Sequence, residues 1–348
     1  MRLLVIRFGA LGDLLHLSPS IAALQAHGQH IEVHLLTSPL YQSLAALLPG
    51  VHTVWTWDKK TGWKGLFQLA AELRRVQFDA VVNLHPSLKS FLLTRLLGSG
   101  WGSAKQAVYR KQKFRVKGQA QRVLPRLHAV SDFYQPFRQV LHLPQADCLS
   151  PALSLPASAQ EALPVKPSGQ HWVGLIPGVG AKRSNRAWEP QGYVHLIQAL
   201  LPRDNLRILL IGGPDEQLLA EQILAGLAEG GHAQPSDSVQ NLCGAYDILG
   251  TAACLAQCDV VVGGDTGPLH LAAAVRVPIV AIYGPTALSR TGPVGEQPIQ
   301  TLTPPEELTC WPCELAECPY SGASHLACMR QIPVDAVLDR VRVQLGLD

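Results

Sequence analysis

The chain has 348 residues, of which 47% are hydrophobic and only 16% charged, a composition that supports a packed core and excludes a disordered chain. Its length predicts two domains. No apolar run reaches the roughly 20 residues needed to cross a bilayer, and the apolar stretch between Arg2 and Arg7 is too short for a signal peptide. We therefore expect a cytoplasmic protein whose eight cysteines are thiols or metal ligands.

The net charge of +3 hides an opposition between the two halves. Residues 1–150 contain 18 Lys and Arg against 7 Asp and Glu, or +11, whereas residues 151–348 contain 11 against 19, or −8. This asymmetry predicts that the first half meets an anionic partner, although a solvated basic face would have the same composition. The basic run 111–117 is not interleaved with several aromatic residues, so we expect no nucleic acid as a partner.

Short β-like runs alternate with helical patterns along residues 1–150, which predicts a parallel sheet with helices on both faces. The expected strands are 3–7, 31–36, 52–55 and 78–83, and the expected helices are 14–27, 41–48, 64–76, 88–97 and 126–142. Residues 143–170 contain five prolines, a density that predicts a linker rather than a strand or a long helix.

The alternation restarts after the linker. The expected strands there are 171–176, 207–211, 239–242, 259–262 and 278–282, and the expected helices are 191–201, 216–228, 247–257, 269–275 and 334–345. We therefore predict an α/β protein with two doubly wound parallel-sheet domains, residues 1–150 and 151–348, which bind a ligand in the cleft between them.

A glycine turn, Gly9-Ala10-Leu11-Gly12-Asp13, separates the first expected strand from the first expected helix. Its spacing is not the GxGxxG fingerprint of dinucleotide-binding proteins. A carboxylate at this position, at the carboxyl end of a strand, suits a general base that acts on a hydroxyl group. The alternative role of Asp13 is to cap the helix.

A second turn, Gly263-Gly264-Asp265-Thr266-Gly267-Pro268-Leu269-His270, presents backbone N–H groups at the start of a helix. This arrangement predicts a diphosphate site to which Thr266 and His270 contribute, whereas a plain capping turn is the alternative.

The loop 177–190 combines small residues with Lys182, Arg183 and Arg186, which suits a phosphate site, although it lacks the Walker spacing. Glu216 follows the next expected strand, where an acid commonly binds ribose hydroxyls. Its alternative role is that of an acid favoured by the helix dipole.

Together with Tyr283-Gly284-Pro285-Thr286, these motifs resemble glycosyltransferase family 9, the ADP-heptose:lipopolysaccharide heptosyltransferases, over nearly the whole chain. The resemblance implies a GT-B fold, which consists of two Rossmann-like domains. It also implies an inverting transfer, with no metal or other cofactor required, of a heptose or related sugar. The donor would be a nucleotide diphosphate sugar such as ADP-heptose, and the acceptor would resemble the lipopolysaccharide core.

The resemblance also implies roles for individual residues. Asp13 would be the catalytic base, and the second half would supply the residues that bind the donor: Lys182, Arg186, Glu216, Asp265, Thr266, Gly267 and His270. Arg186 stands where the family usually has lysine, and Glu189 separates Trp188 from Pro190, so we expect Lys182 to share the phosphate role.

The acceptor would be an anionic glycolipid or oligosaccharide at the inner face of the membrane, where the protein would be peripheral. Gly12, Lys111 and Arg115 are expected on the acceptor side, and the basic stretch 105–126 would steer the acceptor. Two other functions fit the same fold. A nucleotide-sugar epimerase would leave the basic half unexplained, and a non-catalytic nucleotide- or glycolipid-binding protein would tolerate the loss of the Asp13 carboxylate.

Four cysteines near the C-terminus follow the spacing C-x2-C-x4-C-x9-C: Cys310, Cys313, Cys318 and Cys328. In a cytosolic protein this run predicts a structural zinc site. Unpaired thiols or a redox-labile disulfide are the alternatives. The remaining cysteines lie at apolar positions where we expect core packing: Cys148, Cys243, Cys254 and Cys258.

Overall fold

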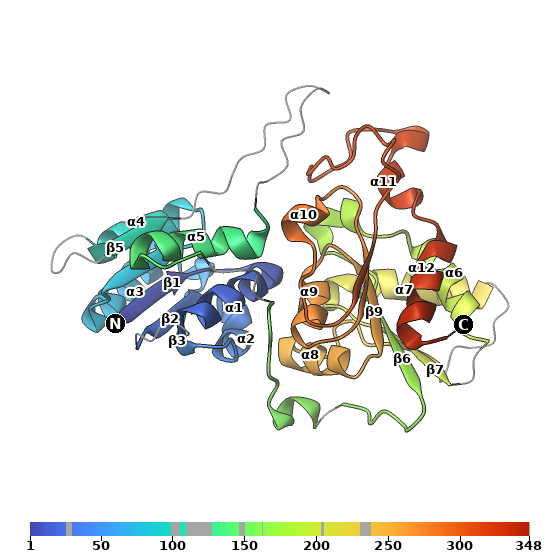
Figure 1. The fold of residues 1–348 in the computed structure, drawn as a ribbon, viewed down its shortest axis with the longest axis horizontal. Coiled ribbons are helices and arrows are strands. Elements are labelled where there is room, and N and C mark those ends of the chain that lie inside the picture. Colours follow the sequence, from blue (N-terminus) through green and yellow to red (C-terminus); the bar gives the residue numbers. More distant parts are fainter. Residues whose placement is uncertain are drawn as a thin grey trace. The chain divides into compact units, whose positions relative to one another are not determined.

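The computed structural model describes residues 1–25, 30–98, 105–108, 127–145, 150–161, 163–202, 205–229 and 238–347. The described chain divides into two compact units, one ending at Ser154 and the other beginning at Leu155. Each unit is a parallel sheet flanked by helices (Figure 1), which confirms the predicted α/β class. Among the described residues, no helix combines the length and the apolar character of a membrane span.

The sheet of the first unit has the strand order β3-β2-β1-β4-β5, and all neighbouring strands are parallel. Its strands are β1 (Arg2–Ile6), β2 (Glu32–Thr37), β3 (Val51–Thr56), β4 (Ala80–Asn83) and β5 (Lys105–Val108). Its helices are α1 (Leu11–Gln25), α2 (Gln42–Ala46), α3 (Gly62–Val76), α4 (Leu88–Gly98) and α5 (Ala129–Leu141). Strand β5 is absent from the sequence prediction because four residues of mixed polarity have no recognisable period.

The core of the first unit surrounds β1, whose residues from Leu3 to Ile6 are fully buried. Side chains of α3 and α4 pack on one face of the sheet, and α1 packs against α5. Since β2 lies on one side of β1 and β4 on the other, the chain changes direction between β1 and β4. At such a switch point the loops at the carboxyl ends of the strands diverge and leave room for a ligand.

The second unit repeats this plan with the strand order β11-β10-β9-β6-β7-β8. Its strands are β6 (His171–Ile176), β7 (Leu206–Leu210), β8 (Val239–Asn241), β9 (Val260–Gly264), β10 (Ile279–Ile282) and β11 (Ile299–Leu302). Its helices are α6 (Pro190–Leu200), α7 (Gln217–Glu229), α8 (Ile248–Ala256), α9 (Gly267–Ala274), α10 (Leu288–Thr291), α11 (Ala327–Arg330) and α12 (Val334–Leu345). The edge strand β11 and the short helices α10 and α11 are absent from the sequence prediction.

The core of the second unit lies between this sheet and helices α6, α7 and α12, while α8 and α9 pack against each other. Trp188 belongs to this core: it is 4% exposed, and its ring packs edge-on against Tyr193, with 5.1 Å between the ring centroids. It therefore fixes the end of the loop 177–190 to α6. The switch point lies between β6 and β9, so the loops that follow these strands are placed to bind a ligand.

Gly192 in α6 allows this tryptophan to approach the helix closely, because a Cβ atom added there would stand 2.6 Å from the Trp188 ring. An alanine at a helical glycine ordinarily adds up to about 1 kcal/mol of stability. We expect Gly192→Ala to lower the free energy of unfolding instead, by about 1–3 kcal/mol, through overpacking. Urea denaturation measures the change, and His195→Ala, at an exposed position of the same helix, is the control. A stabilised Gly192→Ala protein would contradict this account.

Candidate active-site residues

Three of the sequence motifs meet at one carboxylate in the second unit, that of Asp265, which follows β9 and is 7% exposed. The guanidinium Nη1 of Arg186 lies 2.5 Å from Asp265 Oδ2. The hydroxyl of Tyr283 donates to Oδ1 over 3.3 Å, and His270 Nε2 lies 3.7 Å from the same oxygen. The loop after β6, the turn after β9 and the end of β10 are thus joined at the switch point of the sheet.

Asp265 is an anion despite its burial. Burial alone would raise the pKa of Asp265, but the neighbouring His270 and the charge of Arg186 outweigh it and hold this pKa below its ordinary value. Burial and the neighbouring Asp265 raise the pKa of Tyr283, so its phenol stays a neutral donor. The single phenol proton is shared between Asp265 Oδ1 and the nearer carbonyl oxygen of Thr291, at 2.7 Å, and these two contacts fix the ring.

The glycine pair at the end of β9 lets two loops touch. A Cβ atom added at Gly264 would stand 2.7 Å from the carbonyl oxygen of Arg186, and one at Gly263 would stand 3.0 Å from Cβ of Ile176. The glycine pair indicates that something approaches closely. At these two positions it is the protein itself: the backbone of Arg186 at Gly264 and the side chain of Ile176 at Gly263. This close approach brings Arg186 within reach of Asp265.

Glu216 ends a 3-10 helix, Pro214–Glu216, and ties together the loops that follow β6 and β7. Its Oε1 accepts from Gly180 N over 3.0 Å, and its Oε2 accepts from Gly213 N over 2.8 Å. Gly178 accommodates this side chain, since a Cβ atom there would stand 2.4 Å from Glu216 Cγ. Both oxygens already accept one backbone donor each, and each has a further lone pair for a ligand.

The remaining donor-side residues have less defined surroundings. Thr266 is the N-cap residue of α9, but its side chain makes no capping hydrogen bond, and Gly267 is the first helical residue. The backbone of Lys182 belongs to a 3-10 helix, Ala181–Arg186, while its side chain lies outside the described part of the structure. The Thr266 hydroxyl is therefore not committed to the fold as a cap.

In the first unit, Asp13 is the third residue of α1 and not its N-cap. Its Oδ2 accepts from Ala10 N over 3.1 Å, which is how an acid in the first turn reaches back to the N-cap backbone. The same oxygen forms an ion pair with Arg7 Nη2. Among the described residues Oδ1 has no hydrogen-bond partner, and the side chain is 36% exposed, so this oxygen can accept a proton from a ligand. Gly12 precedes Asp13 in the same helical turn.

Sequence reasoning missed Arg7, which directly follows β1 and is buried beside Asp13. Its Nη1 donates to the carbonyl of Leu84, and its guanidinium carbon lies 4.9 Å from the centre of the Phe133 ring. The charge is thus held from three sides and fixes the direction of the Asp13 carboxylate. The detectable sequence pattern was a cation at the end of an otherwise apolar strand, immediately before a glycine turn.

His85, the second residue after β4, lies on the other side of the switch point and was also missed. Burial, Arg7 and Lys59 lower the pKa of His85 to about 4, so the ring is neutral at pH 7. It packs 5.0 Å from the Phe8 ring, and its Nδ1 is buried with no hydrogen-bond partner among the described residues. The predicted acceptor-side residues Lys111 and Arg115 lie outside the described part of the chain.

The fold of the chain matches solved structures of bacterial glycosyltransferases over its whole length. Escherichia coli ADP-heptose lipopolysaccharide heptosyltransferase II superposes with a TM-score of 0.75 at 21% identity, over 99% of both chains. E. coli heptosyltransferase WaaC with ADP superposes with a TM-score of 0.68 at 22% identity, over 99% of this chain and 100% of that one. These matches confirm the predicted GT-B fold, which consists of two Rossmann-like units.

Sequence comparison agrees with the fold. The lipopolysaccharide core heptosyltransferase OpsX of Haemophilus influenzae is 24% identical over 300 residues, 84% of this chain and 81% of that one. Lipooligosaccharide heptosyltransferase 2 of Campylobacter jejuni is 24% identical over 333 residues, 95% of each chain. The model of glycosyltransferase family 9 (heptosyltransferase) matches residues 66–323, well over half of the sequence. The chain therefore belongs to glycosyltransferase family 9 and is a glycosyltransferase.

Proposed function

We propose that this glycosyltransferase moves a heptose from ADP-heptose to a lipopolysaccharide-core acceptor, with inversion at the anomeric carbon and without a catalytic metal ion. The observation that carries the proposal is the joining of three loops around Asp265 at the carboxyl edge of the second sheet. The names of its relatives support the sugar, since the proteins similar to it in sequence include lipopolysaccharide and lipooligosaccharide heptosyltransferases. The solved relative with ADP supports the nucleotide.

In this proposal the donor diphosphate lies at the N-terminus of α9. Backbone N–H groups and the helix dipole favour an anion there, and the uncommitted Thr266 hydroxyl adds a donor. The charge of Arg186 is already balanced by Asp265, so this pair positions the loop and does not supply a free cation. Positive charge for the departing ADP then comes from Lys182 and the exposed Arg183 of the same loop.

Asp13 is the general base of the proposed reaction. Its carboxylate takes the proton of an acceptor hydroxyl while that oxygen forms a bond to the anomeric carbon of the heptose. The bond from this carbon to the phosphate oxygen breaks, its electron pair leaves with ADP, and attack from the opposite face inverts the configuration. Arg7 is a positioning residue, because its buried guanidinium holds the carboxylate by one oxygen and leaves the other to the substrate.

Exposed apolar side chains of the neighbouring helices α3 and α4, here called the membrane patch, support binding of the acceptor at a membrane surface. Four large side chains of α3 and α4 are 45% to 73% exposed: Trp63, Phe67, Leu88 and Phe91. Lys89 Nζ lies 5.4 Å from the centre of the Trp63 ring, and Lys59, Lys60 and Lys64 are exposed nearby in the sequence. Aromatic rings with lysines around them suit the headgroup region of an anionic membrane.

The substitution Asp13→Asn tests the proposed base. It removes the basic oxygen but keeps the side chain's size and its ability to accept from Ala10 N. We expect kcat to fall by about 10²–10⁴-fold, with unchanged ADP affinity in calorimetry. The control is Asp58→Asn, because Asp58 is a carboxylate of the same unit that only caps a 3-10 helix, and Asn caps as well as Asp. Near-normal transfer by a folded Asp13→Asn protein would refute the assignment.

Thr266→Val tests the proposed diphosphate site. The hydroxyl makes no capping bond, so its removal should leave Tm unchanged. Loss of one hydrogen bond to a charged ligand should weaken ADP binding by about 1.5–3 kcal/mol, or roughly 10- to 150-fold. Thr301→Val, at an exposed position of β11, is the control. An unchanged Kd for ADP in Thr266→Val would place the diphosphate elsewhere.

The double substitution Trp63→Ser with Phe67→Ser tests the membrane patch. The protein should co-sediment with phosphatidylglycerol vesicles and be released by salt, because the lysine attraction is screened. The double variant should lose most of this binding. Leu218→Ser with Val343→Ser removes two apolar side chains of the second unit that are more exposed, at 65% and 63%, and is the matched control. Equal loss in both double variants would show that the patch is not a membrane surface.

A further inference from the structure

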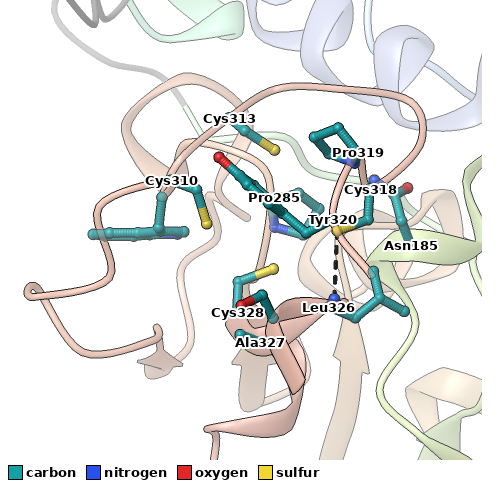
Figure 2. Close-up of a pocket in the computed structure, with 12 residues that line it drawn as sticks. Asn185, Pro285, Cys310, Cys313, Cys318, Pro319, Tyr320, Leu326, Ala327 and Cys328 are labelled. Carbon is teal, nitrogen blue, oxygen red and sulfur yellow. Dashed lines mark hydrogen bonds between the residues drawn. The ribbon is translucent and has the colours of Figure 1, made fainter. Parts of the chain in front are cut away.

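We propose that the second unit contains a structural zinc site made of Cys310, Cys313, Cys318 and Cys328. These residues are spread over the run C-x2-C-x4-C-x9-C, yet they all line one small pocket. Figure 2 shows their sulfur atoms pointing toward the same space from different sides. The pocket has a volume of about 20 Å³, room for a single ion or water molecule. Neither the donor site nor the acceptor side needs this pocket.

The chemistry of the pocket favours a metal ion that binds sulfur ligands in tetrahedral coordination. Among the described residues that line it there is no carboxylate, histidine or basic side chain, so the four sulfurs are the strong metal ligands of this lining. Sets of four cysteine sulfurs are typical of structural zinc, which has no redox chemistry and accepts a closed tetrahedral shell. On binding, each of the four thiols would lose its proton to solvent, and the resulting thiolates would carry the ion.

The four thiols are neighbours in space. The side chains of Cys310, Cys313, Cys318 and Cys328 all form part of the wall of the same small pocket. Among the described residues, no three histidine, cysteine or acidic side chains are arranged so that they could hold a metal ion together. The four sulfurs therefore line the pocket without converging on one point. Zinc binding thus requires the sulfurs to move closer together. Rotation about one side-chain torsion of each cysteine can do this, because the four residues already surround the same pocket.

One ligand is already oriented as metal-bound cysteines commonly are. The sulfur of Cys318 accepts a hydrogen bond from the backbone N of Leu326 over 3.4 Å, drawn as the dashed line in Figure 2. Hydrogen bonds of this kind hold first-shell ligands in place and stabilise sulfur that carries negative charge. Cys328 lies beside the neighbouring strand end, since a Cβ atom added at Gly284 would stand 3.4 Å from its sulfur.

A metal ion at this place would hold the long connection 303–326 between β11 and α11. All of this connection is described, and its only regular element is the 3-10 helix Gly322–Ser324. Connections of this length are uncommon in a compact domain unless something holds them. This one folds back over two segments of the donor side. Leu315 O accepts from Asn185 Nδ2 over 3.0 Å, and Glu314 N donates to Pro285 O over 2.8 Å. The Glu314 carboxylate also accepts from Ala287 N over 2.8 Å.

Zinc would therefore act at a distance from the chemistry. Asn185 precedes Arg186, and Pro285 follows Tyr283 by two residues, so the loop that zinc closes supports two of the three partners of Asp265. This consequence rests on the proposed function, whereas the metal site itself does not. Loss of zinc is expected to loosen the loop, lower Tm and weaken ADP binding, while the Asp13 side remains intact.

Metal analysis of the full-length protein, purified without chelator, tests the site. We expect about one zinc per chain, lost in Cys310→Ser with Cys313→Ser and kept in Cys254→Ser. Cys254 is the matched control because it is a free thiol buried in α8. Cys243 and Cys258 are also buried, as predicted, and Cys148 lies outside the described residues. A protein without zinc, one with iron in its place, or an equal loss of zinc in Cys254→Ser would overturn the proposal.

Cobalt provides a second measurement that does not depend on folding of the variant. Wild-type protein is first freed of metal with a chelator and then titrated with Co²⁺. It should bind one ion per chain and develop the intense visible bands of a tetrahedral cobalt–thiolate centre. Addition of Zn²⁺ should abolish these bands. Absence of these bands while the four thiols react freely with a thiol reagent would refute the site. If the bands appear but ADP binding and transfer never occur, the metal site stands and the proposed function fails.

Discussion

The buried ion pair between Arg186 and Asp265 is the contact on which the organisation of the second unit depends. A buried carboxylate without a partner would take up a proton or unfold the segment around it. With Arg186, His270 and Tyr283 around it, Asp265 remains charged and holds three loops at the carboxyl edge of the sheet. Breaking such a pair from one side is strongly destabilising, so the site and the stability of this edge cannot be separated.

The first unit uses the same device on a smaller scale. Arg7 is buried directly after the central strand and holds Asp13 by one carboxylate oxygen. In both units, then, an arginine near the switch point neutralises an acid and fixes its direction. The consequences differ, because Asp265 is enclosed by its donors while Asp13 is one-third exposed and has an oxygen to offer. An enclosed anion organises structure, and an accessible one can do proton chemistry.

Much of the architecture could be predicted from the order of residues, because helix and strand periods are properties of near neighbours. The alternation of these periods indicated two parallel sheets, and the motifs at Asp13, Asp265 and Tyr283 indicated the family and the strand ends where function gathers. The edge strands β5 and β11 escaped prediction because each is only four residues of mixed polarity and carries little apolar pattern.

By itself, the sequence determined the fold class, the family and the positions of its acids and glycines along the chain. Only the tertiary structure decided their partners. The pairing of β1 with β4 places Arg7 beside Leu84, and the loops that follow β6 and β9 bring Arg186 to Asp265, across separations of 77 and 79 residues. The tertiary structure also buried Trp188 in the core, gave both oxygens of Glu216 to backbone donors, and gathered four cysteines around one pocket. Such contacts follow from how strands pair and helices pack, which no local pattern encodes.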